Sequence, residues 1–114
     1  MTVSLARIIV SVSSLDSSLA FYQGVLGLEP YYVEAPLARL RSGSLDVMLH
    51  QRGAEASDRG VAVSFAVDDV DAATAAASSL GLDIIDEPAD QPWGERQSVV
   101  RDPDGHVVCL VRAL

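Results

Sequence analysis

The sequence contains no lysine, no asparagine and a single cysteine among its 114 residues. With only Cys109 present, an internal disulfide is excluded, and this favours a reducing compartment. No apolar run approaches the ~20 residues that a membrane-spanning helix needs. The N-terminus also lacks the basic and long apolar segments of a signal peptide. We therefore expect a cytoplasmic protein with no membrane partner.

Basic residues are scarce as well. Eight of them, all arginine, stand against sixteen acidic residues, which gives a formal net charge of −8. A nucleic-acid partner would need a basic face for its phosphates, so the charge argues against one. An acidic surface can steer a cationic ligand or can simply keep the protein in solution, and the sequence leaves both open. Apolar residues make up 49% of the chain, enough for one domain with a real core.

The chain contains two copies of one pattern. In each copy a strand end, a short polar turn and a predicted helix precede the motif Leu-Gly-Leu, which stands at residues 26–28 and 80–82. A repeat of this kind indicates a duplicated structural unit. We predict a single domain over 1–114, with a first unit of about 1–55 and a second of about 56–114.

In the first unit, the alternating β-branched segment 6–12 predicts a strand. Ser13 can cap the following helix, with Asp16 three residues later as a short capping-box partner. Helical spacing predicts a buried stripe of Leu15, Leu19, Tyr22 and Leu26, beside a core residue Phe21. Three short strands are then expected at about 29–34, 37–42 and 45–51.

The second unit repeats this order. A strand is expected over 61–67, with Phe65 in the core, and an alanine-rich helix over 70–80. The buried side of that helix is predicted to consist of Val70, Ala73, Ala77 and Leu80. Strands are expected near 83–87, 96–101 and 106–112. The intervening segment 88–95 is predicted to be the longest irregular loop, and it carries the only tryptophan, Trp93.

Two such βαβββ units make an α+β protein with two mixed sheets and a helix packed on the outer face of each. The face of each sheet that lacks a helix must be covered by a neighbour or form a concave, cup-shaped cavity.

Two segments resemble signatures of the vicinal oxygen chelate superfamily, which includes glyoxalases, bleomycin-resistance proteins and extradiol dioxygenases. The first is Leu-Asp-x-Ser-x-Ala-Phe-Tyr-x-x-x-Leu-Gly-Leu at residues 15–28. The second is Trp-Gly-Glu-Arg at 93–96 followed by Arg-Asp-Pro-Asp-Gly at 101–105. The resemblance covers essentially the whole chain. It implies a small-molecule site in the cup-shaped sheets, often completed by a second chain, and therefore a homodimer.

Catalytic members of this superfamily hold one divalent metal with His or Glu from four strands. Carried over residue by residue, these positions fall at Arg7, Met48, Ala62 and Cys109. Arginine and alanine offer no ligand atom, and methionine and cysteine are soft donors that do not suit a hard cation. A shift of one or two residues supplies at most two ligands, where three or four are needed. We therefore predict no metal site and no cofactor.

Strand alternation predicts a mostly apolar inner face with a few polar groups, a composition that suits a small-molecule pocket. The expected inner face consists of Arg7, Ile9, Ser11, Asp46, Met48, His50, Ala62, Ser64, Ala66, Val107, Cys109 and Val111. The ligand-binding residues that we predict are Arg7, Met48, His50, Ala62, Ser64, Trp93 and Cys109.

Two of these residues have alternative interpretations that bear directly on chemistry. Arg7 can donate to a ligand carbonyl or anion, or it can form an ion pair with Asp46 or with an acid across the dimer. His50 can act as a general base or ligand contact, or it can be a partly exposed, hydrogen-bonded residue.

The remaining candidates also have two readings each. Cys109 can be a nucleophile or a buried structural thiol. Trp93, together with Tyr31 and Tyr32, can supply stacking surface for a planar ligand. Alternatively, Trp93 packs its loop onto the sheet.

Three functions remain open on the sequence. The first is a metal-free binding protein that sequesters a hydrophobic or aromatic compound, such as an antibiotic, in a groove of the dimer. The second is an enzyme of the lyase, isomerase or dioxygenase type that acts on a small carbonyl substrate through Arg7 and His50. The third is a degenerate domain with no ligand beyond its own dimer contacts.

Overall fold

The computed structural model describes residues 5–57 and 60–114. By its internal contacts the chain divides into unit 1, Met1–Ala54, and unit 2, Glu55–Leu114, and each is described here by itself. Each unit holds one four-stranded mixed sheet and one helical segment, so the predicted α+β class with two tandem βαβββ units is confirmed. Within the described part of the chain, no helix is long and apolar enough to cross a membrane.

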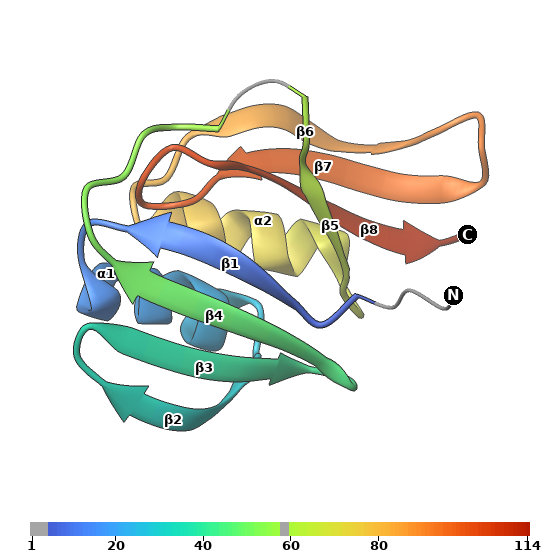
Figure 1. Ribbon diagram of the computed structural model, residues 1–114. Coiled ribbons are helices and arrows are strands. Elements are labelled where there is room, and N and C mark those ends of the chain that lie inside the picture. The colour runs from blue at the N-terminus through green and yellow to red at the C-terminus, as the bar shows by residue number, and fades with distance from the viewer. Residues whose placement is uncertain (1–4, 58–59) are drawn as a thin grey trace. The chain divides into compact units, whose positions relative to one another are not determined.

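The sheet of unit 1 has the strand order β1-β4-β3-β2 (Figure 1). Its strands are β1 (Arg7–Val12), β2 (Glu29–Glu34), β3 (Leu37–Ser42) and β4 (Leu45–Gln51). β1 pairs with β4 in parallel, and the other neighbours are antiparallel. The last three strands span the ranges that the sequence predicts, because Pro36 and the Ser-Gly-Ser turn at 42–44 separate them clearly.

The helical segment of unit 1 differs in detail from the prediction. It consists of α1 (Leu15–Leu19) and a π-helical stretch, η1 (Ala20–Val25). Its cap is Ser14 and not Ser13, since the Ser14 hydroxyl accepts a hydrogen bond from the Ser17 N–H at 3.2 Å. The wider turn of η1 is seen in the 3.0 Å bond from the Leu26 N–H to the Phe21 carbonyl, five residues back.

The core of unit 1 lies between these helical turns and one face of the sheet. Phe21 and Tyr22 are 0% and 2% exposed, and their rings meet edge to face with centroids 4.9 Å apart. The sheet contributes fully buried residues at alternate positions, namely Val12, Ala38, Leu40, Val47 and Leu49. The opposite face of the same strands has no helix or strand from residues 5–54 packed on it, and we call it the open face.

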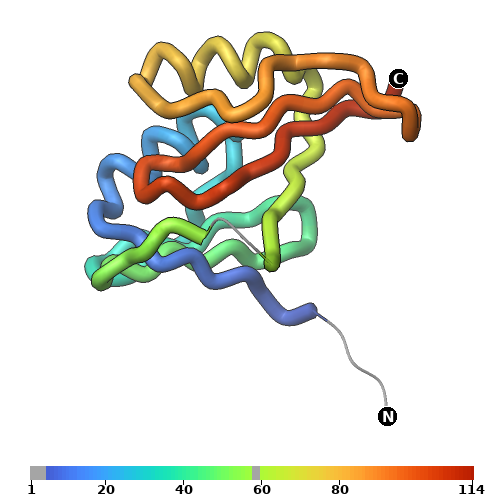
Figure 2. Tube along the Cα trace, turned by 90° about the horizontal axis from the view of Figure 1, so that it is seen from above, coloured from blue at the N-terminus to red at the C-terminus, as the bar shows by residue number. Residues whose placement is uncertain are grey.

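Unit 2 repeats the topology with the strand order β5-β8-β7-β6. Its elements are β5 (Val63–Ala66), α2 (Val70–Ser79), β6 (Ile84–Asp90), β7 (Glu95–Arg101) and β8 (Val107–Ala113). Figure 2 shows α2 lying along one face of this sheet. Val70, Ala73 and Ala77 are buried as predicted, but Leu80 ends the helix and is 48% exposed, so its predicted burial is wrong.

The predicted loop at 88–95 is also wrong, because β6 continues to Asp90 and only a short turn separates it from β7. The pairing of β6 with β7 shifts register twice, between Ile84 and Asp86 and between Asp86 and Ala89. Pro88 is accommodated because β6 is an edge strand, where a missing N–H costs no ladder bond. Because bulges interrupt the regular alternation of inward and outward side chains, the sequence pattern of this strand does not predict its full length.

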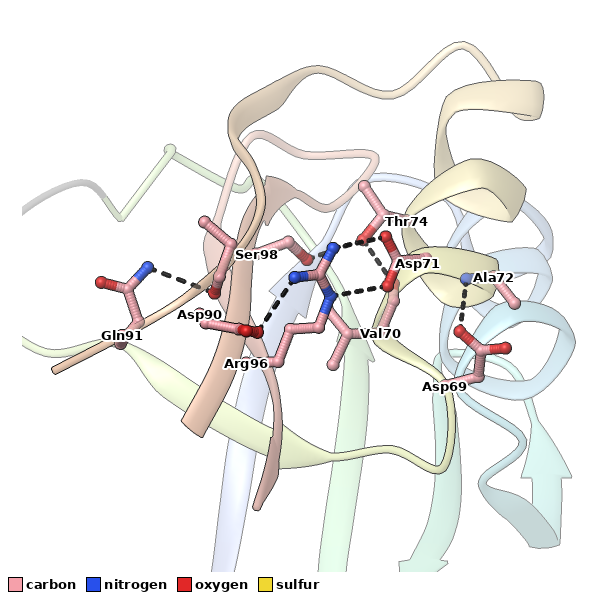
Figure 3. A network of polar contacts seen from close by, with 10 residues as sticks. Asp69, Val70, Asp71, Ala72, Thr74, Asp90, Gln91, Arg96 and Ser98 are labelled. Carbon is pink, nitrogen blue, oxygen red and sulfur yellow. Dashed lines mark hydrogen bonds and ion pairs between the residues drawn. The ribbon is translucent and has the colours of Figure 1, made fainter. Parts of the chain in front are cut away.

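Polar contacts tie α2 to the β6–β7 hairpin (Figure 3). Arg96 donates to both carboxylate oxygens of Asp71 at 2.7 and 2.8 Å and to Asp90 at 3.0 Å. Beneath it, the buried hydroxyls of Thr74 and Ser98 lie 2.7 Å apart, and the Thr74 hydroxyl also donates to the Val70 carbonyl at 2.6 Å. The two contacts of the Thr74 hydroxyl are buried, whereas those of Arg96 are exposed.

The hydroxyl pair predicts a measurable loss of stability on substitution. Thr74→Val keeps the side-chain shape but leaves the buried Ser98 hydroxyl without its partner, so we expect a loss of about 1–3 kcal/mol in the free energy of unfolding. Ser79→Ala is the control, since the exposed Ser79 hydroxyl makes only an intrahelical bond to the Ala75 carbonyl. Urea unfolding measures both variants, and equal effects would contradict the assignment.

Candidate functional site

The open face of unit 1 carries three rows of side chains that run across β1, β4 and β3. The register of these strands gives the rows as Arg7–Asp46–Arg41, Ile9–Met48–Arg39 and Ser11–His50–Leu37. The strand residues between them point to the core. The structure therefore brings the predicted site residues Arg7, Met48 and His50 onto one surface.

Asp46 is the centre of the first row. Its side chain is only 11% exposed, and both carboxylate oxygens are engaged. Oδ2 accepts from Arg39 Nη2 at 2.5 Å and from Arg7 Nε at 3.5 Å, and Oδ1 accepts from the Tyr31 hydroxyl at 2.6 Å. The hydrogen bonds from Arg39 and then Tyr31 hold the pKa of Asp46 below its ordinary value. Of the two interpretations of Arg7, the ion pair with Asp46 is present within the unit.

Tyr31 joins this group through a β-bulge in β2, where the pairing with β3 shifts between Pro30 and Tyr32. The Arg41 guanidinium carbon lies 4.3 Å from the Tyr31 ring centroid and that of Arg39 lies 5.3 Å away, both in cation–π contact. Hydrogen bonding to the Asp46 carboxylate raises the pKa of the Tyr31 phenol. We call Arg7, Tyr31, Arg39, Arg41 and Asp46 together the arginine cluster.

The arginine cluster has the opposite sign of charge from the chain as a whole. Its three guanidinium groups and one carboxylate leave a formal charge of +2, whereas the chain carries −8. Sequence reasoning missed Arg39 and Arg41. Their alternation in the segment Leu-Ala-Arg-Leu-Arg at 37–41 places both arginines on the same sheet face as Asp46. This spacing could have identified them as open-face residues.

The middle row is apolar and accessible. Ile9 is 50% exposed, Met48 is half-buried, and they lie opposite each other in the β1–β4 ladder. His50 lies one row further on, and neither of its ring nitrogens makes a hydrogen bond to a residue within 5–57 or 60–114. Arg7 and Ser11, the partner of His50, are four residues apart on β1, and His50 lies one strand further across, so the Cα atoms of Arg7 and His50 lie roughly 14 Å apart.

The row of unit 2 that corresponds to Ile9–Met48–Arg39 is uncharged. Ser64 of β5 lies opposite Cys109 of β8, which in turn lies opposite Val99 of β7. Cys109 is half-buried, and no hydrogen bond or ion pair of its thiol involves the described residues. Ala62 precedes β5 and is exposed. Phe65 is buried on the helix side, as predicted.

Trp93 stands in the turn between β6 and β7, next to Gly94, whose φ of 88° permits the tight reversal. The side chain is 60% exposed, so within unit 2 most of the indole is not packed on the sheet. A separate open cavity of about 260 Å³ lies between α2 and β6, and its lining includes Asp71, Ser78 and Glu87. None of the predicted site residues lines that cavity.

The residues at the superfamily's metal positions do not fit a hard divalent cation. Arg7 shares its row with Asp46, and Met48 belongs to the next row, so the two transferred positions of unit 1 are not direct neighbours. The one carboxylate in the row of Arg7 already forms ion pairs with two arginines. Over residues 5–57 and 60–114, no three His, Cys, Asp or Glu side chains gather into a ligand group.

Comparison with known proteins agrees with this architecture. The sequence profile of the Glyoxalase/Bleomycin resistance protein/Dioxygenase superfamily matches residues 4–110. CFP32, named as a candidate glyoxylase, is 35% identical over 105 residues in both Mycobacterium bovis and Mycobacterium tuberculosis. The match covers 85% of this chain but only 39% of those relatives, so the chain spans less than half of their length.

Solved structures show the same fold. TioX from Micromonospora sp. ML1 is 26% identical, with a TM-score of 0.71 and coverage of 97% of this chain and 99% of that one. A glyoxalase-related enzyme from Fulvimarina pelagi has a TM-score of 0.81 at 18% identity, with coverage of 96% and 87%. A duplicated βαβββ protein with an open sheet face in each unit is the class that these features define. The chain belongs to the Glyoxalase/Bleomycin resistance protein/Dioxygenase superfamily.

The environment of Asp46 predicts a pH-dependent contribution to stability. Because its folded pKa lies below the ordinary value of 3.8, the carboxylate stabilises the fold fully above about pH 4, and this stabilisation is lost as the pH falls through the lowered pKa. We expect Asp46→Asn to destabilise the protein by about 1 kcal/mol near pH 7 and to differ progressively less from the wild type below pH 4.

Urea unfolding between pH 7 and pH 3 measures this difference. Glu55→Gln, which removes an exposed carboxylate from unit 2, is the control for the general effect of lost charge. A difference between Asp46→Asn and the wild type that stays constant down to pH 3 would contradict the role of the ionised carboxylate.

Proposed function

We propose that the chain binds a small hydrophobic or aromatic molecule on the open face of unit 1 and sequesters it without a resident metal. The observation that carries this proposal is the accessible apolar row of Ile9 and Met48 beside the aromatic ring of Tyr31, which is 41% exposed. Contiguous patches of exposed apolar side chains are uncommon on protein surfaces, and they often mark binding sites. Membership of a superfamily that includes bleomycin-resistance proteins supports the same function.

A second copy of the chain is proposed to complete the groove. The open face of unit 1 also exposes Tyr32, at 43%, opposite Arg39, and such aromatic surface is normally covered by a ligand or a neighbour. The ligand contacts proposed for unit 2 are Ala62, Ser64, Trp93 and Cys109.

The proposal predicts that one charge placed in the apolar row weakens ligand binding. Ile9→Asp puts a carboxylate beside Met48, so we expect any ligand that raises the melting temperature of the wild type to bind at least about tenfold more weakly. The ligands are a panel of aromatic antibiotics, and the measurement is the ligand-induced thermal shift followed by calorimetric titration.

Ile85→Asp is the matched control, since Ile85 is an isoleucine of β6 in unit 2 with a similar exposure of 43%. Equal losses in the two variants, or binding that survives in Ile9→Asp, would reject the open face of unit 1 as the site. Analytical ultracentrifugation of the wild type tests the second copy, and a monomer at the concentrations that bind ligand would reject it.

The second candidate is an enzyme that acts on a small carbonyl compound through Arg7 and His50. The glyoxylase name of the 35%-identical mycobacterial relatives and the unbonded ring of His50 favour it. Against it, the Cα atoms of Arg7 and His50 are separated by roughly 14 Å, so both side chains would have to extend towards each other to contact one carbonyl group.

A turnover assay separates the two candidates. The binding proposal expects no conversion of α-ketoaldehydes or thioesters above the uncatalysed rate. The enzyme candidate expects turnover that His50→Ala lowers by about 10²–10⁴-fold, the usual contribution of a general base. His106→Ala is the control, because His106 lies in the turn before β8 of unit 2. Turnover that follows His50 would replace the binding proposal.

A further inference from the structure

We propose that the arginine cluster of unit 1 binds the anionic group of a planar aromatic ligand, such as an aromatic carboxylate. This inference rests on the proposed binding function and adds the chemical class of the ligand. The overall charge of −8 would instead suggest a cationic ligand, so the two expectations are opposed and can be tested against each other.

The first argument is the unequal number of donors and acceptors in the cluster. Three guanidinium groups provide far more N–H donors than the single carboxylate of Asp46 can accept. Arg41 has no ion pair within 4 Å among the described residues, and Arg39 Nε is buried without an acceptor. An added carboxylate would meet this surplus, because an arginine fork and a carboxylate match in geometry.

The second argument is the position of Arg41. Its guanidinium carbon lies 4.3 Å from the Tyr31 ring centroid. This cation–π contact keeps the planar, charged guanidinium group at the accessible edge of the first row. Arg7 keeps 44% of its side chain exposed while only its Nε contacts Asp46, at 3.5 Å. Both residues therefore have guanidinium groups free to meet an incoming anion.

The third argument is the neighbouring apolar row. Ile9 and Met48 follow Arg7 and Asp46 by two residues along β1 and β4, a spacing of roughly 6–7 Å. A bicyclic aromatic acid spans that spacing, with its ring system against the apolar row and its carboxylate at the arginines. The open face thus presents the two parts of such a ligand with matching surfaces in the right order.

Acidic groups near the cluster weaken its field but do not cancel it. The carboxylate of Asp46 already accepts hydrogen bonds from Arg7, Arg39 and Tyr31. Glu29 lies opposite Arg41 in the β2–β3 ladder but forms no ion pair with it. With Glu29 included, the group still carries a formal charge of +1. The positive electrostatic potential of the cluster is therefore short-ranged. We expect it to stabilise an anion that is already bound, and we expect added salt to weaken this effect.

The experiment compares three probes of one shape by calorimetric titration of the full chain: 2-naphthoate, neutral 2-naphthamide and cationic 2-naphthylmethylammonium. We expect naphthoate to bind at least about tenfold more tightly than naphthamide at low salt, with a preference that shrinks as salt is added. Arg41→Gln should reduce the preference to less than about threefold, because it weakens naphthoate binding much more than naphthamide binding. Arg112→Gln, an exposed arginine of β8 in unit 2, is the matched control and should keep the full preference.

The outcomes separate the two proposals. If naphthamide or the cation binds as tightly as naphthoate and Ile9→Asp removes that binding, the anionic class is wrong and the binding function stands. If naphthoate is preferred but Arg41→Gln and Arg112→Gln lose the preference equally, the arginine cluster is not the site, and the inference is overturned. If none of the probes binds, the inference fails, and the antibiotic panel then decides the binding function separately.

Discussion

The open face of unit 1 depends on one constraint, the need to neutralise the nearly buried carboxylate of Asp46. A carboxylate with 11% exposure is costly unless it is paired and hydrogen-bonded. Arg7 from β1 and Arg39 from β3 therefore turn towards β4, and the bulge in β2 delivers the Tyr31 hydroxyl. These contacts join all four strands of the sheet and fix where its charge lies.

The two units show how one topology can carry different surfaces. Both have the same strand order, and both bury alternate residues beneath a helix. In unit 1 Asp46 lies opposite Arg41 and ties the arginine cluster together, whereas the corresponding pair of unit 2 is Val107 and Arg101, with no carboxylate at that position. The duplicated backbone is held by the helix-facing residues, so the open-face positions are free to differ without loss of the fold.

The fold was predictable because its signals are local. Proline and Ser-Gly-Ser turns separate β2, β3 and β4, and helical spacing identifies the buried side of α2. The strand near 83–87 was predicted, but the continuation of β6 to Asp90 was missed, since two register shifts erase the alternation. The candidate site was only partly predictable. Alternation places Arg7, Met48 and His50 on one face, but the placing of Tyr31 depends on a bulge that no spacing reveals.

The arginine cluster also explains why loss of the superfamily's metal ligands need not leave an inert surface. In a metal-binding member, a cation would supply the positive charge that attracts a ligand's oxygen atoms. Here, arginines from β1 and β3 supply positive charge at the same end of the sheet, and Asp46 holds two of them in place as a carboxylate. Guanidinium groups bind anions through directed hydrogen bonds, but they provide no open coordination position and no acidified water. We propose that such a surface recognises an oxyanion through hydrogen bonds and charge, and this proposed recognition is the physical basis of the binding function argued above.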